Sequence, residues 1–305
     1  MVNTPVLYIT FARPEYAIRS FAAIKKAQPR KLYFYSNKAR EDRADEVKRN
    51  QEVRSLINQV DWECDVKTWF RDEYVDVFTS LWGAIDWVFN NEPEAIIIEE
   101  DVVATEAFWG YCDTLLPRYV NNKSVRMISG NNLTPEFNPK GVDYFFTHQL
   151  DIYGWASWSD RWKSLDRKMI QWPEIRRTKL KDYFDGILCR LWYRLMLDRI
   201  YKRLDTYNPW DYISVYNSIL NNQCGIIPMI NLTWDIGVVG ANSTVKGNEK
   251  KDEVVIPEIE SISLQKFPTE VRPYWKYDYF FFYKRIFLHA LKYFPRRIIQ
   301  KLMGK

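Results

Sequence analysis

The chain of 305 residues is long enough for one large α/β domain, and 47% hydrophobic with 27% charged residues are ordinary values for a globular protein. The net charge of +5 is concentrated at the end of the chain, where residues 284–305 hold seven Lys or Arg and no acid, so the rest carries about −2. This distribution argues against a basic groove for nucleic acid, and no run of about 18 apolar residues predicts a membrane span.

The first 130 residues alternate between strand and helix patterns. Strands are predicted over Val6–Phe11, Lys31–Tyr35, Val66–Phe70, Ala95–Ile98 and Val125–Ser129. Helices are predicted from Pro14 to Ala27, Glu41 to Ile57, Glu73 to Asn90, and from a Thr105 N-cap to Tyr119. This alternation predicts a mainly parallel sheet with helices on both faces, whose ligands bind where the strands end.

The pattern is less regular after residue 140. We expect a strand over Asp143–Gln149, an aromatic-rich loop over Asp151–Trp162 that leads into a helix, helices over Leu180–Leu204 and Asn208–Asn221, and a strand over Ile226–Ile230.

The four cysteines lie far apart, without metal-ligand or redox spacing, which predicts free thiols in a reducing compartment. The start of the chain has neither the basic nor the apolar region of a signal peptide. We therefore expect a cytoplasmic location.

An acidic loop follows the apolar strand at residues 95–98. Glu99, Glu100 and Asp101 stand side by side, and adjacent carboxylates repel each other unless a cation offsets their charge. A divalent cation held there could bridge a nucleotide diphosphate and stabilise charge on the leaving phosphate. The alternative is a solvated acidic loop without a ligand.

The stretch AIIIEEDVVATEAF resembles the strand and loop of the N-acetylglucosaminyltransferase I family and of related bacterial nucleotide-diphospho-sugar transferases, which have the GT-A (Rossmann-like) fold. In that family, a variant DXD motif of Glu-Asp-Asp occupies this place. The resemblance implies that Asp101 is a ligand of Mn²⁺ or Mg²⁺ and that Glu99 and Glu100 lie on the nucleotide-sugar side. The middle acid here is Glu100 instead of Asp.

The segment from Thr10 to Glu15 resembles the first strand and nucleotide loop of the same family, which implies that Phe11 and Arg13 bind the nucleotide. Arg13 lies between a strand and a helix, where a guanidinium can face phosphate; the alternative is a solvated loop residue. The family has an acid after the second strand, near the base, whereas this chain has Ser36-Asn37-Lys38.

Three later segments resemble the acceptor half of the family. Gly154 and Trp155 match a Gly-Trp loop beside the donor and acceptor, and Asp211 after Trp210 matches the catalytic base. Asp235 is a second candidate for a base or an acceptor contact. The structural alternatives are tryptophans that fill the core and aspartates that cap a helix or turn, with Asn208 as N-cap and Pro209 as the first helical residue.

The last segment, residues 277–305, alternates bulky apolar residues with Lys and Arg and is divided by Pro295. It fits a basic amphipathic helix on an anionic membrane surface, or alternatively a helix packed on the domain. We therefore expect a GT-A domain over residues 1–245, with a nucleotide-binding half (1–135) and an acceptor half (136–245), a connecting segment (246–276) and this tail.

Together these features predict a metal-dependent, inverting glycosyltransferase that moves a sugar from a nucleotide-diphosphate sugar, with a UDP-sugar favoured, to a glycan or lipid-linked acceptor. We expect it to act in cell-surface polysaccharide synthesis, peripheral at the inner face of the cell membrane. The alternatives are a retaining glycosyltransferase and a non-catalytic sugar-binding or membrane-docking protein. A nucleotidyltransferase should begin with a Gly-rich phosphate loop, but residues 1–30 contain no Gly.

Overall fold

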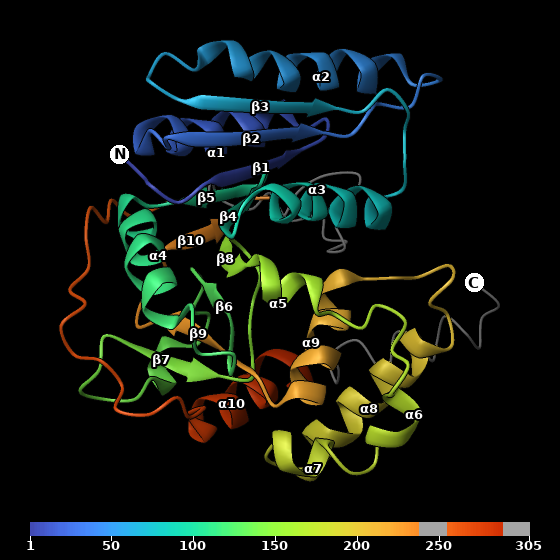
Figure 1. Ribbon diagram of the computed structural model, residues 1–305, viewed down its shortest axis with the longest axis vertical. Coiled ribbons are helices and arrows are strands. Elements are labelled where there is room, and N and C mark those ends of the chain that lie inside the picture. Colours follow the sequence, from blue (N-terminus) through green and yellow to red (C-terminus); the bar gives the residue numbers. More distant parts are fainter. Residues whose placement is uncertain (238–254, 289–305) are drawn as a thin grey trace.

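The computed structural model describes residues 1–237 and 255–288. Its centre is an eight-stranded sheet in the order β3-β2-β1-β4-β8-β6-β9-β7 (Figure 1). The strands are β1 (Val6–Thr10), β2 (Lys31–Ser36), β3 (Asp65–Phe70), β4 (Glu94–Glu99), β6 (Val125–Ser129), β7 (Tyr144–Thr147), β8 (Trp155–Trp158) and β9 (Cys224–Pro228). A second, two-stranded sheet pairs β5 (Val102–Ala104) with β10 (Thr233–Asp235).

The strands from β3 to β4 are parallel to one another, as are β6 and β9, whereas β8 is antiparallel to both β4 and β6 and β7 is antiparallel to β9. The predicted mixed, mainly parallel α/β fold is therefore confirmed, and it is the arrangement expected of a GT-A (Rossmann-like) fold. The sheet continues across the expected division near residue 135, because β6 lies between β8 and β9.

Helices cover both faces of the sheet. They are α1 (Pro14–Ala27), α2 (Ala44–Ser55), α3 (Val77–Asn91), α4 (Glu106–Tyr119), α5 (Ser159–Lys163), α6 (Trp172–Ile175), α7 (Leu180–Tyr183), α8 (Ile187–Tyr201), α9 (Trp210–Asn221) and α10 (Trp275–Phe281). Alternate residues of β1 divide between two cores: Tyr8 belongs to the cluster that includes α1, α2 and α4, whereas Leu7 belongs to the cluster that includes α3 and the helices from α5 to α9. This division explains the unbroken apolar run of the strand.

Two predicted elements differ in the structure. The aromatic loop expected over Asp151–Trp162 contains β8, which inserts between β4 and β6. The long helix expected over Leu180–Leu204 is broken between α7 and α8 at Gly186, whose φ of +90° lies in the region that favours glycine.

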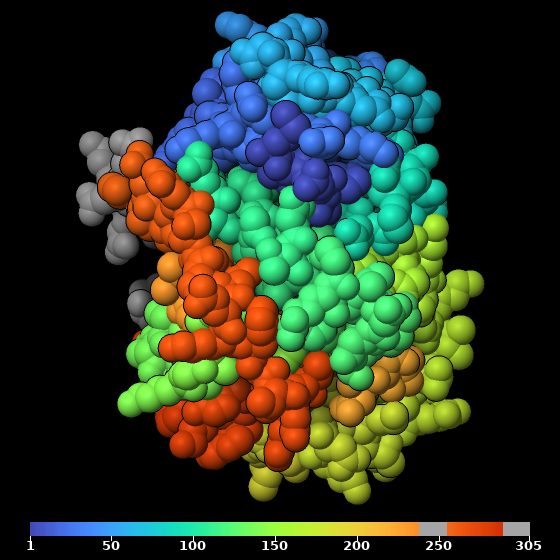
Figure 2. Space-filling view, turned by 60° about the vertical axis from the view of Figure 1, so that its left-hand side comes forward, coloured from blue at the N-terminus to red at the C-terminus, as the bar shows by residue number. Residues whose placement is uncertain are grey.

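Residues 255–274 cross the outside of the domain as an irregular segment (orange in Figure 2). Its Ile259 carbonyl accepts a 2.9 Å hydrogen bond from Ala107 at the start of α4, and its Lys266 carbonyl accepts one of the same length from Asp143. The guanidinium of Arg118 lies over the ring of Phe267, with its carbon 3.9 Å from the ring centroid. This part of the expected connecting segment therefore packs on the domain, while the expected domain end near residue 245 lies outside the described residues.

The described part of the tail also packs on the domain. Tyr277 and Phe281 of α10 join Phe145 and Ile227 in a third core cluster, and a π-helix continues over Phe282–Phe287. The domain-packed alternative thus holds up to residue 288, and residues 289–305, with Pro295, lie outside the described residues. In the described part of the chain, no helix has the length and apolar character needed to cross a membrane. All four cysteines are free thiols, as predicted.

Candidate functional site

Five of the predicted residues meet at the carboxyl ends of β1 and β4. The two strands are parallel, with Ile9 paired to Glu99, so the loops that follow them leave the sheet side by side. Together they line a cleft of about 580 Å³. The predicted residues on its wall are Phe11, Arg13, Glu99, Glu100 and Asp101. The edge predicted from strand order is therefore the edge that carries this cleft.

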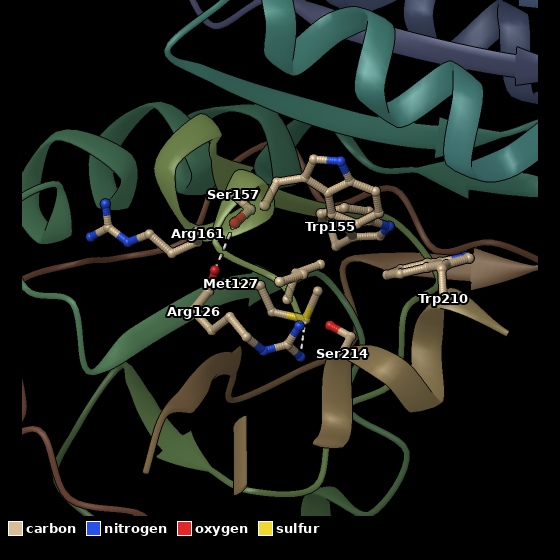
Figure 3. Close-up of a pocket in the computed structure, with 9 residues that line it drawn as sticks. Arg126, Met127, Trp155, Ser157, Arg161, Trp210 and Ser214 are labelled. Carbon is tan, nitrogen blue, oxygen red and sulfur yellow. Dashed lines mark hydrogen bonds between the residues drawn. The ribbon is translucent and has the colours of Figure 1, made fainter. Parts of the chain in front are cut away.

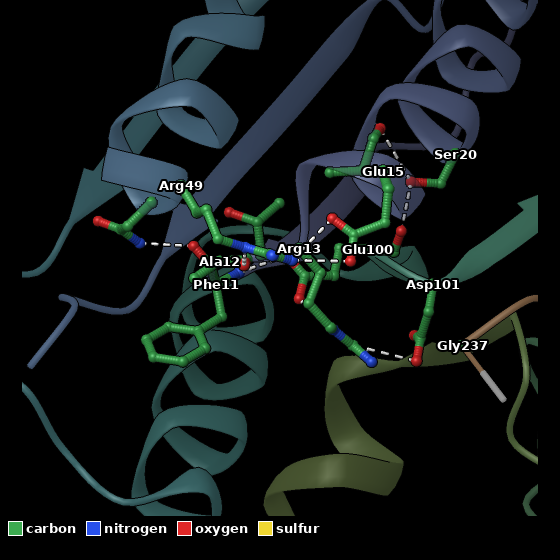
Figure 4. Close-up of polar contacts among 12 residues, drawn as sticks. Phe11, Ala12, Arg13, Glu15, Ser20, Arg49, Glu100, Asp101 and Gly237 are labelled. Atoms are coloured by element: carbon green, nitrogen blue, oxygen red, sulfur yellow. Dashed lines mark hydrogen bonds and ion pairs between the residues drawn. The ribbon is translucent and has the colours of Figure 1, made fainter. Parts of the chain in front are cut away.

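Glu100 joins the two loops (Figure 4). Its carboxylate accepts a 2.7 Å hydrogen bond from the Phe11 backbone N–H and another of 2.7 Å from Arg13 Nε. Its own carbonyl accepts from Ser20 Oγ in α1, at 2.8 Å. Burial raises the pKa of Glu100, and the Arg13 charge opposes that rise. Because its side chain is only 3% exposed, Glu100 holds the loops together rather than facing a ligand.

Asp101 also lines the cleft and forms a second ion pair with Arg13. Its Oδ2 lies 3.0 Å from Arg13 Nη2. Burial alone would lower the pKa of Arg13, but Asp101 and Glu100 together raise it above its usual range. Asp101 is also covered from the far side, since its carbonyl accepts from Ile236 N–H at 2.8 Å and a Cβ on Gly237 would overlap its carboxylate. The loop after β10 therefore fixes the position of Asp101.

Glu99 lies within electrostatic range of the other predicted acids. Burial and the Asp101 charge raise the pKa of Glu99 to about 8; Arg13 opposes this, while Asp235 and Asp211 add to it. The fold thus brings Asp211 and Asp235, more than 100 residues away in sequence, to the acidic loop. Glu99 is consequently protonated near neutral pH, and it can donate a hydrogen bond there.

Asp211 lies in the first turn of α9, which begins at Trp210. Burial raises the pKa of Asp211, whereas hydrogen bonds from backbone N–H groups of the turn lower it. The alternative in which Asn208 caps this helix does not apply, because the Asn208 side-chain oxygen is buried without a hydrogen-bond partner and its carbonyl accepts from Trp82 Nε1. Asp211 thus combines the helix-start position with a raised proton affinity.

The predicted donor and acceptor pocket of Gly154, Trp155 and Trp210 needs correction. Trp155 is 1% and Trp210 3% exposed, and their rings stack with centroids 5.0 Å apart. Gly154 has a φ of +76°, and a Cβ there would approach Thr233 Cγ2 to 2.7 Å. The tryptophans fill the core between β8 and α9, and the glycine allows the close contact with β10, so none of the three offers a surface to a sugar.

Tyr74 and Arg40 also line the cleft, and sequence reasoning missed both. The ring centroids of Tyr74 and Phe11 lie 6.3 Å apart, and the Arg40 guanidinium lies 5.4 Å from the centroid of the Tyr74 ring. Asn37 holds this segment in place by donating to Val75 O at 2.8 Å and accepting from Val75 N–H. No sequence pattern marked Tyr74, because it lies between elements; Asn37 at a strand end was the available signal.

A second cleft of about 510 Å³ adjoins the first, and Asp76, the N-cap of α3, lines both. Its wall also holds Trp82 and Arg167, whose guanidinium lies 4.2 Å from a Trp82 ring centroid and pairs with Asp86. The cleft reaches Asn208, three residues before Asp211. It therefore reaches the residues just before the start of α9.

Carboxylate oxygens at this edge match the ligand preference of Mn²⁺ and Mg²⁺. Within residues 1–237 and 255–288, no three His, Cys, Asp or Glu side chains are grouped so that they could hold a metal. Mg²⁺ is commonly held by one or two carboxylates and by substrate phosphates, without a cage of protein ligands. Asp101, with Glu99 and Asp235 nearby, fits that mode of binding.

Comparisons with known proteins add little. No family model and no curated protein matches the chain. Among solved structures, mouse xyloside xylosyltransferase 1 is 10% identical, with a TM-score of 0.34 over 72% of this chain and 81% of that one. A UDP-glucose pyrophosphorylase bound to UDP-glucose is 8% identical (TM-score 0.34, 75% of this chain, 90% of that one), and the WbbM bifunctional glycosyltransferase is 12% identical (TM-score 0.33, 74% and 45%). Likenesses this weak establish neither the fold nor the activity of this chain.

Proposed function

We propose that this chain is a glycosyltransferase of the GT-A type that uses a nucleotide-diphosphate sugar. The observation that carries the proposal is the cleft where β1 and β4 end, in which Arg13 and Asp101 lie beside an aromatic pair, Phe11 and Tyr74. A flat base needs a stacking face, and a diphosphate needs a guanidinium and a cation. This cleft offers aromatic rings, a guanidinium, and in Asp101 a carboxylate that could hold the cation.

In the proposed complex the base lies against Tyr74 and Phe11, and the diphosphate lies toward Arg13. Asp101 would hold a Mn²⁺ or Mg²⁺ ion, which when bound supplies Lewis-acid stabilisation of charge on the leaving diphosphate. When phosphate oxygens bind the Arg13 guanidinium, they replace Asp101 as its partner, and the Asp101 carboxylate is released from the ion pair. Glu99 lines the same cleft beside Asp101 and would contact the donor there.

The acceptor hydroxyl is deprotonated by Asp211. The raised pKa of this carboxylate favours proton uptake, and its place near Glu99 puts it within reach of a sugar held at the acidic loop. The acceptor enters along the second cleft, whose wall includes the carboxylates of Asp76 and Asp86 as hydrogen-bond acceptors for sugar hydroxyls. A base on that side, opposite the leaving diphosphate, gives inversion at the anomeric carbon.

The test is release of UDP from a panel of UDP-sugars in MnCl₂, with water or added glycans as acceptor. We expect the Asp101→Ala and Asp211→Asn variants each to turn over at least about 100-fold more slowly than wild type, as is typical when a metal ligand or general base is lost. Asp182→Asn, an exposed acid in α7, is the matched control and should keep full activity.

Two results would change the assignment. Near-normal rates for Asp211→Asn would remove the base and favour a retaining enzyme. Binding of UDP-sugars without turnover by wild type or by Asp101→Ala would favour a non-catalytic sugar-binding protein.

We also propose that the protein is peripheral at the inner face of the cell membrane. The support is the excess of basic residues after residue 283, of which Lys284 pairs with Glu136 on the domain. Pelleting with anionic liposomes by the full chain, but not by a chain ending at Leu288, which keeps the packed helix α10, is the expected result. Equal pelleting of the two would remove the idea.

A further inference from the structure

A small cavity lies beneath the two stacked tryptophans, between β6, β8 and α9 (Figure 3). Arg126 reaches it from β6, Trp155 from β8, and Ser214 from α9. The remaining wall is formed by the residues Met127, Ser157, Arg161, Trp162, Leu165 and Trp210. The cavity is separate from the two clefts, since neither cleft has a lining residue in common with it.

Three buried polar atoms on this wall have no hydrogen-bond partner: Arg126 Nε, Trp155 Nε1 and Ser214 Oγ. The three residues are 6%, 1% and 1% exposed, so bulk water does not satisfy these groups. A buried donor left without a partner costs about 1–3 kcal/mol, and three around one space point to a species that fills it. Two of these groups, the guanidinium N–H and the indole N–H, can only donate.

The charge around the cavity is positive and uncompensated. Arg126 makes no ion pair with any Asp or Glu in the described part of the chain, and its Nη2 reaches only the Met127 sulfur, at 3.5 Å. Arg161 is also on the wall, but it already donates to the carbonyls of Tyr119 and Val120 and pairs with Asp160. No acid lines the cavity. A buried guanidinium without a counter-charge costs several kcal/mol, and burial lowers its pKa to about 10.

The size of the cavity limits its occupant to one small species. The centre of a water-sized sphere has about 10 Å³ of room there, close to what a single buried water needs. A water could accept from Arg126 and Trp155, but it would leave the charge of Arg126 unbalanced. A halide ion can accept from a guanidinium, an indole N–H or a hydroxyl, and it neutralises the guanidinium as well.

We propose that this cavity is a binding site for a single monovalent anion, chloride in solution, held by Arg126, Trp155 and Ser214. The anion would fix the first turns of α9, because Ser214 lies one helical turn after Asp211 and Trp210 packs on Trp155. The site is thus a structural anion site that positions the proposed base, and it depends only on the geometry of the core.

The direct test is a crystal grown or soaked in NaBr, with an anomalous difference map at the bromine edge. We expect one peak within hydrogen-bond distance of Arg126 Nε and Ser214 Oγ. In solution, exchanging sodium gluconate for NaCl at constant ionic strength should raise Tm, by roughly 3 °C for each tenfold increase in chloride above its dissociation constant.

Ser214→Ala keeps the fold while removing one donor, and it should shift the chloride dependence to higher concentration. Arg126→Met should abolish it. Lys48→Met removes an exposed positive charge on α2, at the opposite end of the sheet from the cavity, and should leave the chloride dependence unchanged. A cavity without anomalous signal, together with equal Tm in chloride and gluconate, would show a water in its place and overturn the proposal; this result is independent of any transferase activity.

Discussion

The edge formed by β1 and β4 and the layer between β8 and α9 were both expected to hold ligand-binding residues, yet the structure uses them differently. At the first, polar side chains follow parallel strands and meet in an open cleft. At the second, Trp155 and Trp210 turn inward and stack. The difference shows that charged residues after a buried strand report a site, because burial of a charge is costly, whereas aromatic residues satisfy a core as readily as a sugar.

The largest effect is expected from Trp155→Ala, which tests the second region. Truncating a buried tryptophan should lower the free energy of unfolding by about 3–5 kcal/mol, as for other large core residues. Urea unfolding gives this value, and titration with UDP and Mn²⁺ at low temperature should show nearly unchanged affinity. If the Trp155→Ala protein were stable but bound UDP weakly, Trp155 would have to be assigned to the ligand site.

Arg13→Met tests the first region. It leaves the buried Glu100 carboxylate with its N–H bond from Phe11 but without its cation, which should cost about 3 kcal/mol of unfolding free energy. It should also remove most of the UDP affinity. The control is Lys25→Met, since the Lys25–Asp61 pair is 41% and 64% exposed on its two sides and should contribute about 0–1 kcal/mol.

A loss under 1 kcal/mol for Arg13→Met would mean that Glu100 is stable without its partner. The account of Glu100 as the link between the two loops would then fail.

A pH effect of intermediate size is expected beside β8. Burial raises the pKa of Asp151 to about 6, against the lowering influence of Arg285. The folded state therefore binds the Asp151 proton more tightly than the unfolded state does. The stabilisation of the fold by this proton is complete below about pH 4 and is lost as the pH rises through 6. Asp151→Asn should then be more stable than wild type at pH 7.5, by about 2–3 kcal/mol, and nearly equal to it at pH 4.

Thermal unfolding of wild type and of Asp151→Asn across this pH range measures the difference in their stability. Other groups, such as Glu99, titrate in both proteins, so their contributions cancel in the difference. A constant difference at every pH would show that Asp151 is not the titrating group.

Much of this fold followed from the sequence because the apolar strand runs and amphipathic helices of the first 130 residues are local signals. The pairing of Ile9 with Glu99 then made the clustering of Arg13 and Asp101 a consequence of topology. The rest depended on long-range packing. β8 was missed because WASW is only four residues long, too short for a strand pattern to stand out in an aromatic-rich segment. The burial of its aromatic residues against α9 became visible only in three dimensions.

The base side of the cleft could not be predicted for the same reason. Tyr74 lies in an irregular segment that is placed by the hydrogen bonds between Asn37 and Val75, 38 residues apart. Likewise, the approach of Asp211 and Asp235 to Glu99 depends on how α9 and β10 pack, which no local pattern encodes.

The most direct measurement of the central claim is a structure with UDP and Mn²⁺, supported by calorimetry on wild type and Tyr74→Ala. The account predicts the diphosphate within hydrogen-bond distance of Arg13, the ion on Asp101, the uracil against Tyr74, and an affinity loss of about 1 kcal/mol, roughly fivefold, in the variant. UDP bound elsewhere on the molecule, or no binding with Mn²⁺ present while the Arg13–Asp101 ion pair stays closed, would contradict it.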